Sequence, residues 1–188
     1  MTQRDASGPG PPDGELVARA REGDAAGFDT LVRRHYRAAL AVALAVTGRR
    51  DDAEDVCQDA WIRALEKLDE CRQPDRFVYW LLQIVRNRAR NFLDYRRVRR
   101  TETLESVEAE AAGPSGQVAR LRLRLEEAMA GLTETQREIV LLHDLEGWDH
   151  RSIAENLGMS EVMSRQHLFQ ARRRLRDKLR DVEEVRSE

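Results

Sequence analysis

The chain has few residues of the types that build disulfide frameworks or metal sites. It contains 2 cysteines and 4 histidines among 188 residues. Cys57 and Cys71 form no Cys-x-x-Cys motif, and no histidine clusters with them in the sequence. We therefore expect neither a zinc site nor a disulfide framework, and we interpret both cysteines as ordinary thiols in a reducing cytoplasm.

Long apolar runs are also missing. The most hydrophobic segment, residues 38–46, is much shorter than the roughly 20 apolar residues that a membrane helix requires. The N-terminus lacks the apolar core of a signal peptide. We expect a cytoplasmic protein without membrane insertion. The sequence has no phosphate-binding glycine loop and no nucleophile–base pair, so we expect no cofactor and no enzymatic activity.

Aromatic residues make up only 5% of the chain, and alternating runs of Val, Ile and Thr are scarce. Ala, Leu, Arg and Glu dominate instead, and these residues favour helices. Hydrophobic residues account for 41% of the chain and charged residues for 35%, enough for a folded core beneath a large charged surface. The composition and periodicity predict an all-α fold of two small helical domains joined by a flexible linker.

The pattern along the chain sets the expected domain boundaries. We expect tails at residues 1–14 and 181–188, helical domains at residues 15–100 and 118–180, and a linker at residues 101–117. The linker sequence has neither Lys nor Arg up to residue 117, carries four glutamates and includes a Gly-Pro pair. Such a composition is typical of flexible segments.

Capping residues delimit the helices expected in the first domain. Asp24 and Gly48 bracket a helix over about residues 25–47, because aspartate caps helix starts and glycine ends helices. Asp51 and Glu54 are spaced as a reciprocal capping pair for the next helix. A further helix is expected over about residues 76–97.

Charge is strongly segregated although the formal net charge is only −2. Residues 51–70 contain eight acidic and two basic side chains, whereas residues 86–100 contain seven arginines and one acid. This separation predicts one surface for a basic partner and another for an anion.

Residues 149–176 have the layout of a helix, a tight turn and a strongly basic second helix. Gly158 is expected to end the first helix, and Ser160 to cap the second. Apolar residues then recur every three or four positions, with arginines between them. This arrangement suits a helix that packs on a core and faces DNA phosphates, so it predicts a helix-turn-helix at the end of the second domain.

Each domain carries a set of spaced residues that is typical of one protein family. The set in the second domain is Leu132–Thr133, Gln136–Arg137–Glu138, Leu141–Leu142, Glu146–Gly147, Ile153–Ala154–Glu155, Leu157–Gly158, Ser160–Glu161 and Ala171–Arg172–Arg173. The set in the first domain is Asp52–Val56, Gln58–Asp59, Ala60–Trp61, Phe77, Trp80–Leu81, Ile84 and Arg86–Asn87. With these residues, both domains resemble parts of bacterial RNA polymerase sigma factors. Two such domains with no third between them resemble the extracytoplasmic-function group, and the resemblance covers residues 15–179.

The resemblance implies a promoter-specificity subunit that binds core RNA polymerase, recognises the −35 and −10 promoter elements and promotes DNA opening. It implies contacts with the coiled coil of the largest polymerase subunit and with the flap, and restraint by an anti-sigma factor. An acidic helix face can complement basic residues of the polymerase. The polymerase-binding residues implied on that face are Asp55, Gln58, Asp59 and Glu66.

The helix expected from residue 76 combines arginines with aromatic rings. Single-stranded DNA is bound by such a combination, because cations follow phosphates and rings stack on unpaired bases. The resemblance places a flipped-base site at residues 70–74, although the loop sequence itself indicates no pocket. For Trp80, a core position and a DNA-wedge position remain open. Our candidates for −10 binding are Tyr79, Trp80, Asn87, Arg88, Arg90 and Asn91.

The early part of a recognition helix meets base edges, and later cations meet phosphates. The family usually has Gly, a small polar residue and Val where Val162, Met163 and Ser164 stand. We expect Ser164 to point inward, where its hydroxyl needs a partner, and Met163 to rotate inward in place of the missing Val. The expected base-reading residues are Arg165, Gln166, His167 and Gln170, with Arg172, Arg173 and Arg176 on the DNA backbone.

Two other functions would each account for one domain taken by itself. A stand-alone transcriptional regulator would use the first domain as a ligand sensor or dimer interface. It would leave the acidic helix and the arginine–aromatic helix without a role. A helical adaptor that does not bind DNA would leave two arginine-rich helices unexplained.

Overall fold

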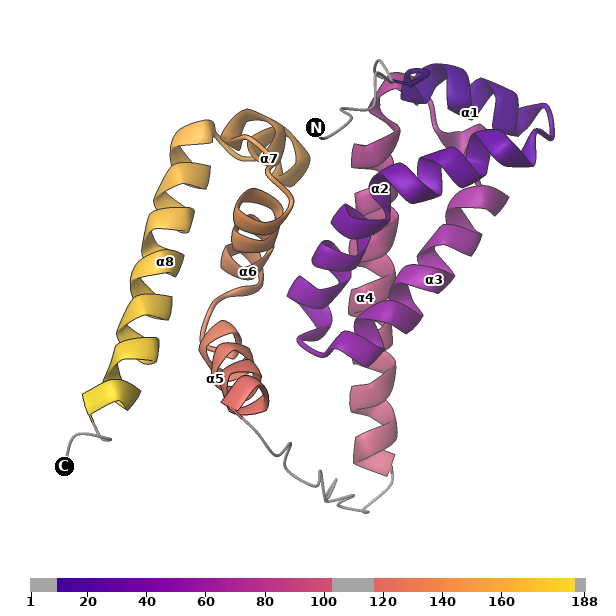
Figure 1. Ribbon diagram of the computed structural model, residues 1–188. Coiled ribbons are helices and arrows are strands. Elements are labelled where there is room, and N and C mark those ends of the chain that lie inside the picture. Colours follow the sequence, from indigo (N-terminus) through magenta and orange to yellow (C-terminus); the bar gives the residue numbers. More distant parts are fainter. Residues whose placement is uncertain (1–9, 103–116, 185–188) are drawn as a thin grey trace, which may run out of the picture.

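The fold is known from a computed structural model that describes residues 10–102 and 117–184. Within these residues all regular structure is helical and forms two groups, as the sequence predicted (Figure 1). The first group comprises α1 (Asp13–Arg21), α2 (Ala25–Thr47), α3 (Arg50–Glu66), the short 3₁₀ turns η1 (Leu68–Glu70) and η2 (Pro74–Arg76), and α4 (Phe77–Glu102). The second comprises α5 (Gln117–Ala130), α6 (Glu134–Val140), the π-helical turn η3 (Leu141–Leu145), α7 (His150–Leu157) and α8 (Glu161–Glu184).

The core of the first group lies between α2, α3 and α4. Small residues of α2, including Ala39 and Ala43, are fully buried, so the neighbouring helices can approach its backbone closely. Larger side chains fill the ends of this core. The ring centroids of Trp61 and Phe77 lie 6.2 Å apart, and Phe77 is fully buried.

The predicted caps of α2 are confirmed, whereas the predicted cap of α3 is wrong. The Asp24 side chain accepts a 2.9 Å hydrogen bond from the backbone N–H of Ala26, and Gly48 ends α2 with φ of 71°. The residue that precedes α3 is Arg49, in extended conformation, so Asp51 lies within the first helical turn. An acidic side chain still stabilises the helix there, through the positive end of its dipole.

Several expected boundaries shift by a few residues. The tail expected over residues 1–14 overlaps α1, because Asp13 is held by ion pairs with Arg34 and His35 at 2.6 and 2.7 Å. The long helix α4 continues past its expected end at residue 97, and α8 extends into the tail expected over residues 181–188. Residues 1–9, 103–116 and 185–188, which include most of the expected linker, lie outside the described residues.

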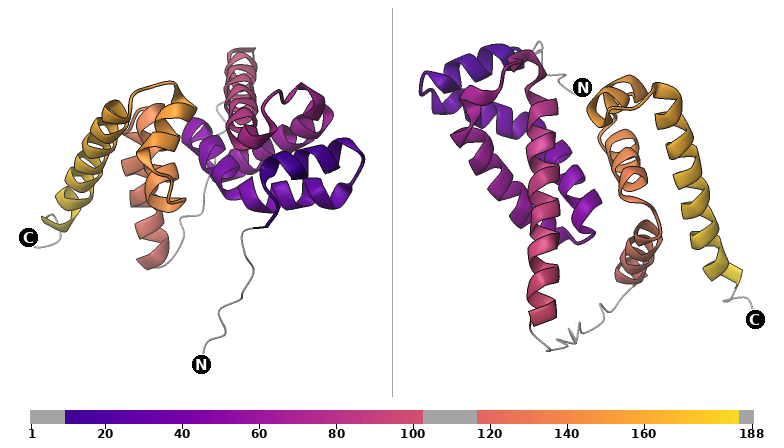
Figure 2. Two further views of the ribbon diagram at one scale, coloured as in Figure 1. Left: turned by 90° about the horizontal axis from the view of Figure 1, so that it is seen from above. Right: turned by 180° about the vertical axis from the view of Figure 1, so that it is seen from behind.

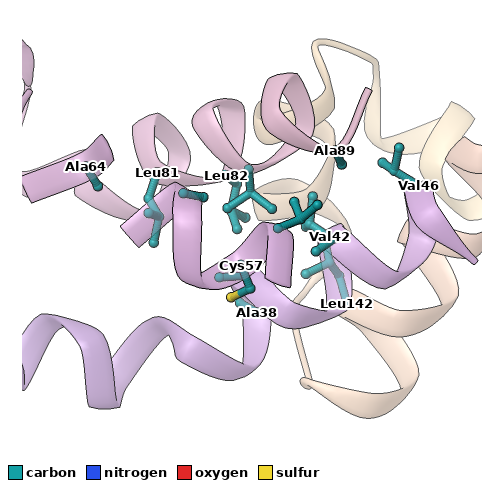
Figure 3. Packing of buried hydrophobic residues seen from close by; sticks show 14 of the residues in the cluster. Ala38, Val42, Val46, Cys57, Ala64, Leu81, Leu82, Ala89 and Leu142 are labelled. Atoms are coloured by element: carbon teal, nitrogen blue, oxygen red, sulfur yellow. The ribbon is translucent and has the colours of Figure 1, made fainter. Parts of the chain in front are cut away.

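The two helical groups are in contact. Helix α6 and turn η3 pack against α2, while α8 lies on the side of the second group away from the first (Figures 1 and 2). In the close view, Leu142 of η3 lies beside Val42 of α2 (Figure 3). Buried residues of both groups therefore form one continuous apolar cluster. Within the described ranges, no helix combines the length and apolar character that a membrane span requires.

Candidate polymerase and promoter interfaces

The helix-turn-helix predicted over residues 149–176 is present. The Asp149 side chain caps α7 by accepting a 2.7 Å hydrogen bond from the Ser152 backbone N–H. Gly158 ends α7 with φ of 66°, a conformation that glycine adopts without steric cost. The Ser160 hydroxyl then accepts a 3.2 Å hydrogen bond from the Met163 backbone N–H at the start of α8. The sequence thus fixes the turn through local hydrogen bonds.

One face of α8 packs on the rest of its group. Leu168 and Ala171 are buried, and Ser164 is fully buried among them. The Ser164 hydroxyl shares a 2.9 Å hydrogen bond with Nδ1 of His150, so its predicted inward position and its need for a partner are both confirmed. The prediction for Met163 is wrong, since 48% of its surface is exposed. Met163 immediately precedes Ser164 and lies about 100° from it around the helix, so it cannot share the inward position of Ser164.

His150 of α7, which shares the hydrogen bond with Ser164 of α8, lies in a positively charged environment. Burial lowers the pKa of His150, and the positive charges of His143, Arg165 and Arg172 lower it further. The ring centroids of His143 and His150 lie 4.6 Å apart. The neutral imidazole is therefore favoured beside Ser164.

Most of the predicted base-reading residues lie on the outer face of α8. Arg165, Gln166 and Gln170 are exposed, and Arg165 pairs with Glu161 at 2.8 Å. The Gln170 carbonyl accepts a 3.4 Å hydrogen bond from the Gln136 amide. His167 differs from the others, because it is half-buried and its Nδ1 atom is buried.

The predicted backbone contacts follow along the same helix. Arg172, Arg173 and Arg176 are all exposed, and Arg172 also makes hydrogen bonds to the carboxylate of Asp144 in η3. Burial tends to raise the pKa of Asp144, but hydrogen bonds from Arg172 and His143 outweigh it and lower the pKa. Arg172 thus has a carboxylate partner in η3, Arg173 lies 4.0 Å from the Asp177 carboxylate one turn further along α8, and Arg176 extends the positive surface.

The acidic face predicted on α3 is exposed to solvent. Asp55, Gln58 and Glu66 are exposed, and Asp59 is half-buried because it pairs with Arg88 of α4. Two apolar residues that sequence reasoning missed, Ile62 and Leu65, lie on the same side of α3, and each is 52% exposed. A heptad count would have found them, because they follow Asp55 and Gln58 by seven residues. This face therefore combines negative charge with uncovered apolar surface.

The −10 candidates form two sets on α4. Asn87, Arg90 and Asn91 are exposed, and Arg90 donates a 2.7 Å hydrogen bond to Glu134 of α6. Arg88 is held by Asp59, so a predicted DNA contact and a predicted polymerase contact pair with each other.

The aromatic candidates lie near the start of α4. The Tyr79 ring meets Trp148 edge-on with centroids 6.0 Å apart, and the guanidinium of Arg76 lies 4.8 Å above Tyr79. Trp80 packs against Phe77, with ring centroids 5.8 Å apart, and it also reaches the surface. It is therefore a core residue on one side and a surface residue on the other, and its role as a DNA wedge stays a prediction.

A pocket lies at the loop for which the sequence indicated none. Its volume is about 320 Å³. The residues 70–73 form one wall and α4 forms another, while α7 of the second group closes a third side. Both aromatic candidates take part. The lining residues are Glu70, Arg72, Gln73, Arg76, Tyr79, Trp80, Gln83, Glu155 and Asn156.

Polar contacts join α4 to the second group beside this pocket. Arg86 donates hydrogen bonds to both carboxylate oxygens of Glu138, and it also contacts the side-chain oxygen of Asn156. Arg76 pairs with Glu155 at 2.5 Å. The second group therefore covers part of the α4 surface that carries the −10 candidates.

Both cysteines lie in the core of the first group. Burial raises the pKa of Cys57 to about 11, and it also raises the pKa of Cys71. Each is a free thiol. The described residues hold no cluster of three or more His, Cys, Asp or Glu side chains arranged for a metal ion.

Family comparisons match both helical groups. Residues 31–101 match Sigma-70 region 2, and residues 122–175 match Sigma-70, region 4. The chain is 32% identical over 171 residues to the RNA polymerase sigma factor NccH of Alcaligenes xylosoxydans xylosoxydans, covering 87% of this chain and 92% of that protein. It is 35% identical to the probable RNA polymerase sigma factor RfaY of Xanthomonas campestris pv. campestris, and the match covers 81% of this chain and 40% of RfaY.

Two solved structures of sigma factors are similar to this chain. CnrH in complex with the cytosolic domain of CnrY superposes with a TM-score of 0.66 at 29% identity, covering 90% of this chain and 97% of CnrH. RpoE in complex with the anti-sigma factor NepR, from Bartonella quintana, gives a TM-score of 0.58 at 25% identity, covering 81% of this chain and 96% of RpoE. The ECF sigma factor SigM of Mycobacterium tuberculosis is 31% identical, covering 87% of this chain and 82% of SigM. The match to region 2 leaves the stand-alone regulator without support, and the chain belongs to the extracytoplasmic-function sigma factors of RNA polymerase.

Proposed function

We propose that this sigma factor binds core polymerase through the exposed face of α3, engages the −10 element with α4 and its pocket, and reads the −35 element with α8. It supplies specificity and catalyses no reaction of its own. The observation that carries the proposal is the pocket beside the Tyr79 and Trp80 rings, at the surface where arginines are also exposed. Promoter opening requires that unpaired bases be held, and this surface has the required chemistry.

The polymerase contact is argued from both charge and apolar area. Asp55 and Glu66 give the α3 face its negative charge, which attracts the basic residues of a coiled coil. Ile62 and Leu65 lie among these acids, and burying two such side chains supplies affinity that exposed charges alone do not. The proposed partner is the coiled coil of the largest subunit, with a further contact between the second group and the flap.

The −10 contact combines a pocket with a cationic helix. A base that leaves the duplex loses several kcal/mol of stacking and pairing, and a fitted pocket can offset that loss. Trp80 has a fixed inner side against Phe77, so its outer side presents a rigid ring to DNA. Asn87, Arg90 and Asn91 continue along α4 toward the phosphates of the same strand.

The closed arrangement of the two groups bears on this step. Arg90 is engaged by Glu134, and the pocket is closed on one side by Glu155 and Asn156. For α4 to receive a single strand along its length, the second group must move away from it. The proposal therefore includes a separation of the two groups on the polymerase.

The remaining partners follow from the family. The relatives CnrH and RpoE were solved with CnrY and with the anti-sigma factor NepR, respectively. We propose that a protein of the anti-sigma class likewise restrains this chain, and that it acts in the cytoplasm, where RNA polymerase transcribes the chromosome.

Run-off transcription tests the proposal. The chain is mixed with bacterial core RNA polymerase and a library of promoter fragments, and new transcripts are sequenced. We expect initiation that depends on the chain and shares two sequence elements upstream of the start sites. Asp55→Lys should abolish core binding, and Trp80→Ala should leave core binding intact but reduce DNA opening, measured by permanganate reactivity of unpaired thymines. If the wild-type chain does not bind core polymerase, the proposal is wrong.

A further inference from the structure

Among the described residues of α8, three large apolar side chains are exposed, and Met163, at 48%, is the least exposed of them. Val162 is 70% exposed and Phe169 is 69% exposed. The apolar packing of α8 is already supplied by its inner stripe, where Leu168 and Ala171 are buried. Val162 and Phe169 therefore have no role in the core.

The two residues lie on one ridge of the helix. Seven positions correspond to almost two helical turns and about 10.5 Å along the axis. Gln166 and Arg173 occupy the same ridge at the intervening and following turns, and both are exposed. The ridge thus alternates apolar, polar, apolar and cationic side chains in the part of the helix proposed to enter DNA.

Single exposed apolar residues are common on protein surfaces, so exposure alone carries no conclusion. The surroundings decide the kind of partner. An apolar protein-docking face would be continuous, whereas here arginines at positions 165 and 173 flank the apolar residues and match the charge of DNA. In the major groove, the only apolar group on a base edge is the C5-methyl group of thymine.

We infer that Val162 and Phe169 read thymine methyl groups in the −35 element. This rests on the proposed function, namely that α8 lies in the major groove. A helix lying along the groove would place the two side chains about three base pairs apart, since each base pair rises about 3.4 Å. Arg165 and Gln166 would read the base edges near these methyl groups, so thymine recognition would supplement the hydrogen-bonded readout.

Replacing thymine by deoxyuridine tests the inference, because it removes the methyl group and leaves the hydrogen-bonding edges unchanged. The −35 duplex is taken from promoters selected by the wild-type holoenzyme, and each thymine in it is replaced in turn. Affinities are measured by competition for the holoenzyme. At the contacted positions we expect binding to weaken about fourfold, the effect of leaving one methyl-sized group unburied.

Variants assign each methyl contact to a side chain. Phe169→Ala should bind the thymine and deoxyuridine duplexes equally at one position, and Val162→Ala should do so at another. Val162→Thr keeps one methyl group and should retain part of the discrimination. Leu123→Ala, an exposed apolar residue of α5, is the matched control and should keep the wild-type ratio.

Three results would overturn the inference. The first is a wild-type holoenzyme that binds every deoxyuridine duplex as tightly as the parent. The second is discrimination that persists in both alanine variants. The third is loss of core binding by Phe169→Ala with an unchanged thymine preference, which would assign the patch to a protein partner. A wild-type chain that selects no −35 sequence at all would instead remove the proposed function, and the inference with it.

Discussion

Arg86 of α4 and Glu138 of α6 form a buried ion pair that joins the two helical groups. Hydrogen bonds of 2.9 and 2.7 Å run from the guanidinium to Glu138 Oε1, and the two side chains are 8% and 2% exposed. A carboxylate that is almost completely buried relies on this single cation, because burial removes the water that would otherwise solvate it. Arg86 lies on the same helix as the residues that we propose bind the −10 element.

The first prediction concerns the stability that this pair confers. Glu138→Ala leaves the Arg86 charge buried without its partner, so we expect it to lower the free energy of unfolding by about 3–5 kcal/mol. Urea unfolding followed by circular dichroism measures the change. Glu134 pairs with Arg90 and is more exposed than Glu138, so Glu134→Ala should change the free energy of unfolding by less than about 1 kcal/mol. Equal effects of the two variants would contradict the buried role of Glu138.

The second prediction concerns the apolar part of the polymerase-binding face. Ile62→Ala removes an exposed side chain, so stability should hardly change, but core binding should weaken about tenfold or more if the residue becomes buried in the complex. Titration of labelled core polymerase in the absence of DNA measures this affinity. The matched control is Val162→Ala, which removes an apolar side chain that is still more exposed, 70% against 52%, from α8 and should leave core affinity unchanged.

The third prediction separates base reading from phosphate binding on α8. Arg165→Ala should change the sequence preference at one −35 position by about 1–3 kcal/mol. Arg173→Ala should weaken all duplexes alike and reduce the salt dependence of binding by about one counterion. Affinity measured at several salt concentrations, on matched and single-base-changed promoters, distinguishes the two effects. A uniform loss across sequences in Arg165→Ala would remove its base-reading role.

The sequence predicted those features that depend on nearby residues. The caps at Asp24 and Ser160 form between residues a few positions apart, so their spacing was sufficient evidence. Asp51 shows the limit of this reasoning. Its spacing to Glu54 suits a capping box, but α3 begins at Arg50, and Glu54 pairs with Arg50 instead.

Long-range relationships could not be predicted from spacing. Arg86 and Glu138 are 52 positions apart, and they meet only because α4 and α6 both pack against α2. Arg88 and Asp59 were assigned to different partners, yet they pair across α3 and α4. The pocket was hidden for the same reason, since its walls come from a loop, α4 and α7. For Ser164, periodicity predicted burial, but the identity of His150 as its partner required the fold.

The fourth prediction concerns the cysteines. Because burial raises the pKa of both thiols, the reactive thiolate is scarce at neutral pH, and neither sulfur is accessible. We expect a thiol reagent to modify the native chain far more slowly than the urea-unfolded chain. Transcription by a Cys57→Ser and Cys71→Ser double variant should respond to oxidant as the wild type does. Rapid labelling of the native chain would show that the core opens near these residues.

The fifth prediction is a pH dependence centred on His150. Its pKa is lowered by burial and by the charges of His143, Arg165 and Arg172, and Glu161 opposes this only in part. The folded protein therefore binds this proton more weakly than the unfolded chain. The pKa of this ring in the unfolded chain is about 6.5, and above that pH the contribution of neutral His150 to stability is fully present. The contribution is lost as the pH falls through the lowered pKa of the ring in the folded protein.

The measurement is the melting temperature between pH 7.5 and pH 5. We expect the melting temperature of the wild type to decrease toward acid, and that of His150→Gln to decrease less, although the variant starts lower because Ser164 loses its hydrogen-bond partner. Asp13 and Asp144 do not interfere, since hydrogen bonds from their cationic partners lower the pKa of both carboxyls and keep them charged throughout this range. NMR titration of the His150 ring provides a direct check. A midpoint at or above the ordinary histidine value would contradict the lowered pKa and, with it, a neutral ring beside Ser164.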